Sequence, residues 1–159
     1  VRGAGLVIVS EPMAVRADQA LNMGADLTIN PIEQDLETRI MEITGNHGAD
    51  VIITAAPVHK AQEAALSIAA IGGRINYFGG LPKDNPRIQF NSNLVHYKEL
   101  VITGTTACST ADCWQASRLV NLGLVDLSDL ISQRFPLGQA QEAFSAAENR
   151  NTLKIVIEP

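Results

Sequence analysis

The chain has 159 residues, a length that fits one globular domain. Twelve lysines and arginines against 17 aspartates and glutamates give a net charge of −5, which argues against nucleic acid or an anionic membrane as the main partner. Hydrophobic residues make up 46% and charged residues 18%, which excludes a disordered chain and supplies enough apolar material for a core.

The beginning of the chain, VRGAGLVIVSEP, does not have the layout of a secretory signal, and no apolar run reaches the roughly 18 residues of a membrane span. Cys108 and Cys113 are too few for a disulfide framework. We therefore expect a cytoplasmic protein in which both cysteines are ordinary buried or half-buried residues. Because position 1 is Val rather than Met, we also expect the natural start to lie upstream.

Short apolar runs alternate with amphipathic stretches along the chain. In DLETRIMEITG, for example, Leu36, Ile40 and Ile43 recur at helical spacing before a glycine. The predicted strands are 6–10, 27–30, 50–56, 74–80, 100–106, 132–135 and 153–159. The predicted helices are 13–24, 35–45, 58–73 with a Gly-Gly stop, 109–123 capped by Ser109 or Thr110, a short one near 127–131, and 138–149. The stretch 81–93 is predicted as a polar loop.

This alternation predicts an α/β fold, because short and continuously apolar strands between helices are typical of a parallel sheet buried on both faces. The expected architecture is a doubly wound parallel sheet of the Rossmann type. The whole range 1–159 is predicted to be a partial dinucleotide-binding domain.

The glycine-rich phosphate loop of such a domain is not found. Gly3-Ala4-Gly5 precedes a strand instead of following one, and Ile8 stands where the third glycine of G-x-G-x-x-G belongs. We therefore expect the first strand and the glycine loop to be missing from this chain. In the strand order 3-2-1-4-5-6 that first strand is central. Without it the strands at 6–10 and 50–56 each lose a neighbour, so we expect this segment to fold poorly alone.

Ligands of open parallel sheets bind at the carboxyl ends of the strands. Small residues stand there in this chain: Thr54-Ala55-Ala56-Pro57, Phe78-Gly79-Gly80 and Gly104-Thr105-Thr106. Small side chains would let a flat nicotinamide or adenine ring approach the backbone. Tight packing of the turns between strands and helices explains the same residues equally well.

Glu11 ends the first predicted strand, which would be the second strand of a complete sheet. An acid at that place accepts hydrogen bonds from the adenosine ribose and repels a 2′-phosphate, so Glu11 favours NAD over NADP. The alternative is a solvated carboxylate placed before a proline at a helix start, where the helix dipole favours it.

Metal-ligating residues are sparse. His47, His59 and His96 are scattered, Cys108 and Cys113 are five residues apart, and no C-x-x-C or H-x-x-x-H pair occurs. No Ser/His/Asp arrangement with a nucleophile elbow is present either. We expect neither a metal site nor a catalytic residue in this chain.

Several motifs together resemble the cofactor-binding part of the zinc-dependent medium-chain alcohol and polyol dehydrogenases, nearest the sorbitol and threonine dehydrogenase branch. The resemblance covers nearly the whole chain. Its motifs are VIVSEP, LNMGAD, DVIITAAP, GGRINYFGG, the more specific HYKELVITGT at 96–105, and the closing LKIVIEP.

The resemblance implies a role for particular residues in binding NAD. Glu11 would hold the adenosine ribose, Arg16 would cover that ribose or its adenine, and Lys154 would reach the pyrophosphate. The nicotinamide end would be lined by Ala55, Ala56, Phe78, Gly79, Thr105 and Thr106.

The resemblance also implies hydride transfer between a secondary alcohol and NAD in the parent enzyme, whose zinc ligands lie in a catalytic domain that is absent here. We therefore expect the isolated chain to be inactive. It further implies a small alcohol or polyol as substrate and a homo-oligomer joined through the sheet edge near 100–105. Two alternatives stay open: a zinc-free oxidoreductase of quinone-reductase type, and a non-catalytic nucleotide-binding or assembly module.

Overall fold

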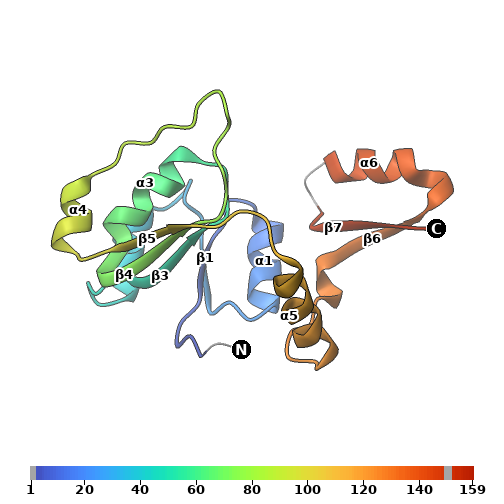
Figure 1. Ribbon diagram of the computed structural model, residues 1–159, viewed down its shortest axis with the longest axis horizontal. Coiled ribbons are helices and arrows are strands. Elements are labelled where there is room, and N and C mark those ends of the chain that lie inside the picture. The colour runs from blue at the N-terminus through green and yellow to red at the C-terminus, as the bar shows by residue number, and fades with distance from the viewer. Residues whose placement is uncertain (1–2, 149–151) are drawn as a thin grey trace. The chain divides into compact units, whose positions relative to one another are not determined.

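A computed structural model describes residues 3–148 and 152–159, in which strands and helices alternate along the chain (Figure 1). The strands are β1 (Ile8–Ser10), β2 (Leu27–Ile29), β3 (Ala49–Thr54), β4 (Ala69–Tyr77), β5 (Val101–Gly104), β6 (Ile131–Pro136) and β7 (Lys154–Glu158). The helices are α1 (Ala14–Asn22), α2 (Leu36–Ile43), α3 (His59–Ile68), α4 (Ser92–Tyr97), α5 (Thr110–Asn121) and α6 (Ala140–Glu148), with 3₁₀ turns at Ser128–Leu130 and Leu137–Gln139. Every strand pair among the described residues is parallel, which confirms the predicted α/β class.

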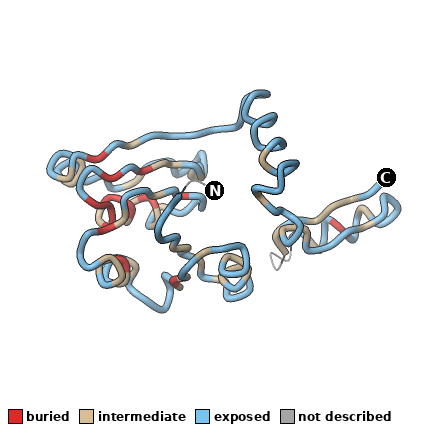
Figure 2. Tube along the Cα trace, turned by 90° about the horizontal axis from the view of Figure 1, so that it is seen from below, coloured by how far each residue is buried: buried red, intermediate tan, exposed pale blue. Residues whose placement is uncertain are grey.

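One compact unit consists of residues 31–107 and contains the parallel sheet β3-β4-β5. Helix α3 packs against this sheet, and most of the buried residues in Figure 2 belong to this unit. The core cluster is made of buried apolar side chains, which are those of Ala65, Leu66, Ala69, Ile75 and Leu100. Ile75 in the middle strand is fully buried, which places the centre of the core at β4.

The two faces of β3 differ, because successive side chains of a strand point to opposite sides. Ile52 packs against the core cluster, whereas Val51 and Ile53 are each 64% exposed. The prediction that the strands are buried on both faces is therefore wrong for β3. Within this unit the packed helices and the core cluster lie on one side of the strand only.

The second compact unit consists of the described residues of 1–30 and 108–159. Strand β1 pairs with β2 beside α1, and β6 pairs with β7 beside α6. Ile29 of β2 and Ala143 of α6 are each 1% exposed. In the described part of the chain, β2 is the neighbour of β1 and β4 is the neighbour of β3.

The boundary between α3 and β4 differs from the prediction of a helix over 58–73. Helix α3 ends at Ile68, and β4 begins at the next residue. The ammonium of Lys98 donates to the carbonyl oxygens of Ser67 at 2.6 Å and Ala69 at 2.8 Å. A cation that binds the last carbonyls of a helix is a favourable C-terminal partner. Because this partner comes from another part of the sequence, the local pattern did not reveal where the helix ends.

Helix α4 is a second difference, since the stretch before it was predicted as a loop and no helix was predicted at 92–97. The side chain of Asn91 caps this helix by accepting a hydrogen bond from the N–H of Asn93 at 3.1 Å. Leu94 and Val95 then pack against the core cluster. Burial of these two side chains stabilises a helix too short to form alone.

No helix in residues 3–148 and 152–159 is long and apolar enough to cross a membrane.

At the start of α5, Ser109 is the N-cap, as one of the two predicted candidates. Its hydroxyl accepts a hydrogen bond from the N–H of Asp112 at 3.2 Å, and the carboxylate of Asp112 accepts from the N–H of Ser109 at 2.8 Å. This reciprocal pair is a capping box.

Replacing Lys98 by Met should lower the free energy of unfolding by about 2 kcal/mol, because two hydrogen bonds from a charged donor to backbone carbonyls are lost. Urea unfolding followed by circular dichroism measures the change. Lys83→Met is the matched control, since Lys83 is exposed, and should change stability by less than about 0.5 kcal/mol. Equal losses in the two variants would show that Lys98 does not stabilise the end of α3.

Candidate cofactor-binding site

The turns that follow β3 and β4 lie against each other in the unit of residues 31–107. The N–H of Gly79 donates to the carbonyl oxygen of Thr54 at 2.7 Å. From α3, Gln62 Nε2 donates to the carbonyl oxygen of Gly79 at 2.8 Å. Thr54 and Gln62 are both buried, so these bonds are shielded from water. The peptide groups of Gly79 are therefore held on both sides.

Position 79 has no room for a side chain. A β-carbon there would lie 2.8 Å from the carbonyl carbon of Ala55 and 2.9 Å from that of Ala56, closer than real β-carbons approach. Ala55, Ala56 and Phe78 are exposed. The structure thus brings together four of the predicted cofactor residues where two neighbouring strands end: Ala55, Ala56, Phe78 and Gly79.

Asn76 of β4 connects this region to the end of β5. Its Nδ2 donates to Thr105 Oγ1 at 2.7 Å and to Thr103 Oγ1 at 3.1 Å. The N–H of Thr105 also donates to the carbonyl oxygen of Tyr77 at 3.2 Å. Thr105 is thereby fixed beside β4, and Thr106 follows it on the exposed surface.

Asn76 and Gln62 were not among the residues predicted from the sequence. Asn76 is the only side-chain amide in β4, and a half-buried amide in a strand that needs a partner is the signal that could have identified it. Gln62 lies on the buried face of α3, where an unpaired amide would be costly. Gln62 donates a hydrogen bond to the carbonyl of Gly79, and Asn76 donates one to the hydroxyl of Thr105.

Glu11 follows β1 in the other unit. Its N–H donates to the carbonyl oxygen of Ile29 at 3.0 Å, and its Oε1 accepts from the N–H of Met13 at 2.9 Å. Glu11 is half-buried. A carboxylate has about four lone-pair sites, so the bond to Met13 leaves most of the acceptor capacity of Glu11 for other donors.

The two predicted cations belong to the same unit as Glu11. Arg16 lies in the first turn of α1 and is half-buried, and its N–H donates to the carbonyl oxygen of Met13. Lys154 begins β7 and is exposed, and its partner in the ladder is Ile131. Backbone contacts thus place Arg16 close to the residue that Glu11 binds, while Lys154 lies on a different strand pair.

The histidines have separate local partners. His47 Nε2 lies 3.0 Å from Asp50 Oδ1, His59 Nε2 lies 2.8 Å from the carbonyl oxygen of Asn85, and His96 contacts the ring of Tyr97. In residues 3–148 and 152–159, no group of three or more His, Cys, Asp or Glu side chains could hold a metal ion.

The two cysteines are exposed, so the prediction that they are buried or half-buried is wrong. Their sulfur atoms are 3.4 Å apart. The hydrogen bond with the thiol of Cys113 raises the pKa of Cys108, and slight desolvation and the nearby Asp112 carboxylate act in the same direction.

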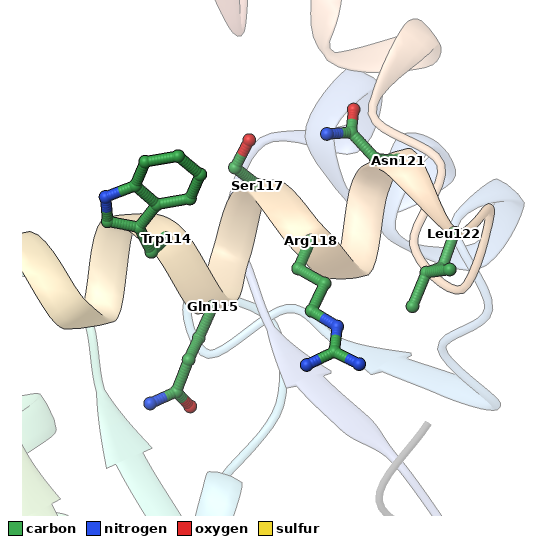
Figure 3. A pocket seen from close by; sticks show the side chains of 6 residues that line it. All are labelled: Trp114, Gln115, Ser117, Arg118, Asn121 and Leu122. Carbon is green, nitrogen blue, oxygen red and sulfur yellow. The ribbon is translucent and has the colours of Figure 1, made fainter.

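A shallow hollow lies on the surface of α5 (Figure 3). In Figure 3, one row of side chains with Trp114, Ser117 and Asn121 points away from a second row. The second row consists of Gln115, Arg118 and Leu122. The hollow is thus a groove along a single helix and includes none of the predicted cofactor residues.

The sequence profile described as zinc-binding dehydrogenase matches residues 1–121. Over 156 residues the chain is 35% identical to an L-threonine 3-dehydrogenase of Pyrococcus horikoshii, covering 97% of this chain and 44% of that protein. It is 25% identical over 145 residues to a sorbitol dehydrogenase of Halalkalibacterium halodurans, covering 91% of this chain and 42% of that protein.

Solved structures give a consistent result. An alcohol dehydrogenase from Thermotoga maritima matches with a TM-score of 0.87 and 31% identity, over 99% of this chain and 44% of that chain. A zinc-binding dehydrogenase from Sinorhizobium meliloti, solved bound to NADP, matches with a TM-score of 0.87 and 25% identity, over 99% of this chain and 46% of that chain.

The chain therefore belongs to the zinc-binding dehydrogenase family, which confirms the resemblance of its motifs. Its parallel α/β arrangement is that of the Rossmann-like cofactor-binding domains of these enzymes. It spans less than half the length of the curated relatives that it matches.

Replacing Gly79 by Ala should lower the free energy of unfolding by about 1–3 kcal/mol, because the added methyl group would collide with backbone atoms after β3. Thermal or urea unfolding measures the loss. Gly80→Ala is the control, since nothing lies within 4 Å of a β-carbon there. If both alanine variants are as stable as the wild type, the two turns are not in the close contact described.

Proposed function

We propose that this chain is the NAD-binding part of an alcohol or polyol dehydrogenase that transfers hydride between a secondary alcohol and NAD. The proposal rests on the carboxyl ends of β3, β4 and β5, which lie side by side. There Gly79 lies against Ala55, and Asn76 donates a hydrogen bond to Thr105. Dinucleotides bind to α/β sheets at the carboxyl ends of parallel strands. Membership of the zinc-binding dehydrogenase family supports the same ligand.

The residues at this edge suit a flat aromatic ring. Ala55, Ala56 and Gly79 have little or no side chain, so a nicotinamide ring could lie close to their peptide groups. Phe78 is 59% exposed and offers an apolar surface beside them. The hydroxyls of Thr105 and Thr106 can donate to or accept from a carboxamide.

Glu11 supports the choice of NAD over NADP. Its carboxylate is already oriented by the N–H of Met13, so it loses little freedom when it accepts hydrogen bonds from ribose hydroxyls. A 2′-phosphate at the same place would meet a negative charge of like sign. The family relative solved with NADP binds the other cofactor, so the choice depends on such local residues rather than on the fold.

Arg16 and Lys154 complete the proposed set through their charge. A guanidinium in the first turn of α1 can stack on an adenine or reach the ribose, and an ammonium can neutralise a pyrophosphate. Both roles come from the resemblance of the sequence to the family.

The nicotinamide ring, when bound, supplies the acceptor for hydride. The residues named here bind and orient that ring, and none of them is assigned a proton transfer. The described residues do not fit zinc, because they offer no set of three ligands, so no step through a metal is assigned to this chain. The alcohol or polyol substrate and its zinc belong to the proposed parent enzyme.

We further propose that the parent enzyme is a homo-oligomer joined at the edge of β5. Among the described strands β4 is the neighbour of β5, and Val101 at this edge is 42% exposed. A strand edge with unpaired backbone groups is a template for a second copy. The molar mass of the parent enzyme in solution measures its oligomeric state.

A cytoplasmic location remains a prediction from the sequence.

Replacing Glu11 by Gln should reduce the preference for NAD over NADP by about tenfold, because the charge is lost while the amide oxygen can still accept from Met13. Calorimetric titration of the protein with NAD⁺ and with NADP⁺ gives the two affinities.

Glu33→Gln is the control for this titration, since Glu33 is an exposed carboxylate outside the proposed site. The control should leave the preference unchanged. An unchanged preference in Glu11→Gln would mean that Glu11 serves only the backbone near α1. Absence of any binding to either nucleotide would contradict the proposed function itself.

A further inference from the structure

Cys108 and Cys113 form a pair of thiols on the surface of the protein. They are the only cysteines in the sequence, both are exposed, and their sulfur atoms are 3.4 Å apart. Cys108 directly precedes the N-cap of α5, and Cys113 lies in the first turns of the helix. Two thiols in contact within one accessible segment are a potential site of oxidation.

The surrounding backbone fixes this distance. Ser109 and Asp112 form the capping box that joins the segment before α5 to its first turn. The N–H of Cys113 also donates to the carbonyl oxygen of Ser109 at 3.1 Å. Each cysteine is therefore adjacent in sequence to one member of the capping box, and the proximity of the sulfurs follows from the local fold.

The turn that leads into this segment is also specific. Ala107 has a φ of 55°, a left-handed conformation that residues with a β-carbon adopt rarely. Such a conformation persists only where the surrounding structure enforces it.

The distance between the sulfurs is close to that required for a bond. A disulfide has a sulfur–sulfur distance of about 2.05 Å, so the two atoms at 3.4 Å would need to approach by roughly 1.4 Å. The ring would close over only five residues, so little chain entropy opposes it.

We propose that Cys108 and Cys113 are a reversible dithiol–disulfide couple whose substrate is a small-molecule disulfide. A thiolate of one cysteine attacks the small disulfide, forms a mixed disulfide and releases one thiolate. The second cysteine then attacks the mixed disulfide at the protein sulfur and releases the second thiolate. One protein disulfide forms, one small disulfide is reduced to two thiols, and the two cysteine protons pass to the released thiolates.

The dithiol couple does not depend on the proposed cofactor-binding function, because its test measures disulfide formation without any nucleotide.

The test is equilibration of the protein in buffers with graded ratios of reduced to oxidised glutathione, followed by acid quenching and alkylation. Trypsin cleaves after Lys98 and Arg118, so both cysteines fall in one peptide, 99–118. We expect this peptide to lose two hydrogens with a single midpoint, with no glutathione attached and no disulfide-linked protein dimer. Persistent glutathione adducts, disulfide-linked protein dimers or two unreacted thiols would each overturn the proposal.

Variants separate a couple from two independent thiols. Cys108→Ser and Cys113→Ser should each retain glutathione as a stable adduct, because the second attack is lost. Ser109→Ala removes the capping box and should lower the equilibrium constant for the disulfide about fivefold, the size expected for loss of one N-cap.

Ser128→Ala is the matched control, since Ser128 binds Asp126 in a turn of its own, and it should leave the equilibrium constant unchanged. Equal constants for Ser109→Ala and Ser128→Ala would refute the role of the capping box. If a variant does not fold, the wild-type titration alone still decides whether the disulfide forms.

Discussion

Helix α3 packs against the middle strand β4, and this contact positions the other parts of the unit of residues 31–107. Ala65 and Leu66 of the helix meet Ile75 of the strand, and all three are completely or almost completely buried. Burying a side chain such as Leu66 or Ile75 contributes about 1.5–3 kcal/mol. The same helix supplies Gln62, whose amide holds the carbonyl of Gly79. The helix that forms the core thus also holds the turn at the proposed cofactor site.

Two distant contacts extend this arrangement. Lys98 binds the last carbonyls of α3, which fixes where β4 begins, and Asn76 binds Thr105 at the end of β5. One contact lies at the start of β4 and the other near its carboxyl end. The parallel ladders of β4 with β3 and with β5 set the register in which the three strands end at one edge. Lys98 belongs to the motif at 96–105 and lies just before β5 in the sequence. Its contact with the end of α3 gives one residue of that motif a structural role.

Much of the fold follows from local patterns, and the differences arise where a distant residue decides. Alternation of apolar strands with amphipathic helices was sufficient for the parallel α/β class, and the N-cap of α5 is Ser109, one of the two residues predicted for it. The end of α3 was not predictable, because Lys98 lies about 30 residues further along the chain. Helix α4 was missed because a short helix depends on tertiary packing more than on its own sequence.

The proposed site was also only partly predictable, because some of its contacts depend on residues that are distant in sequence. Residues that follow strands could be identified by position, and the contact of Gly79 with Ala55 shows that some of them meet. Asn76 and Gln62 escaped notice because their partners are carbonyl and hydroxyl groups far away in sequence. The exposure of Cys108 was mispredicted because a small residue of low polarity is usually buried.

The most direct test of the account is hydrogen–deuterium exchange of the protein with and without NAD⁺. Slower exchange is predicted for the backbone amides after β1, β3, β4 and β5, which include those of Glu11, Ala56, Gly79 and Thr105. Exchange along α5 should not change. Protection confined to α5, or no protection at the four strand ends under conditions where NAD⁺ binds, would contradict the central claim that residues following these strands bind the cofactor.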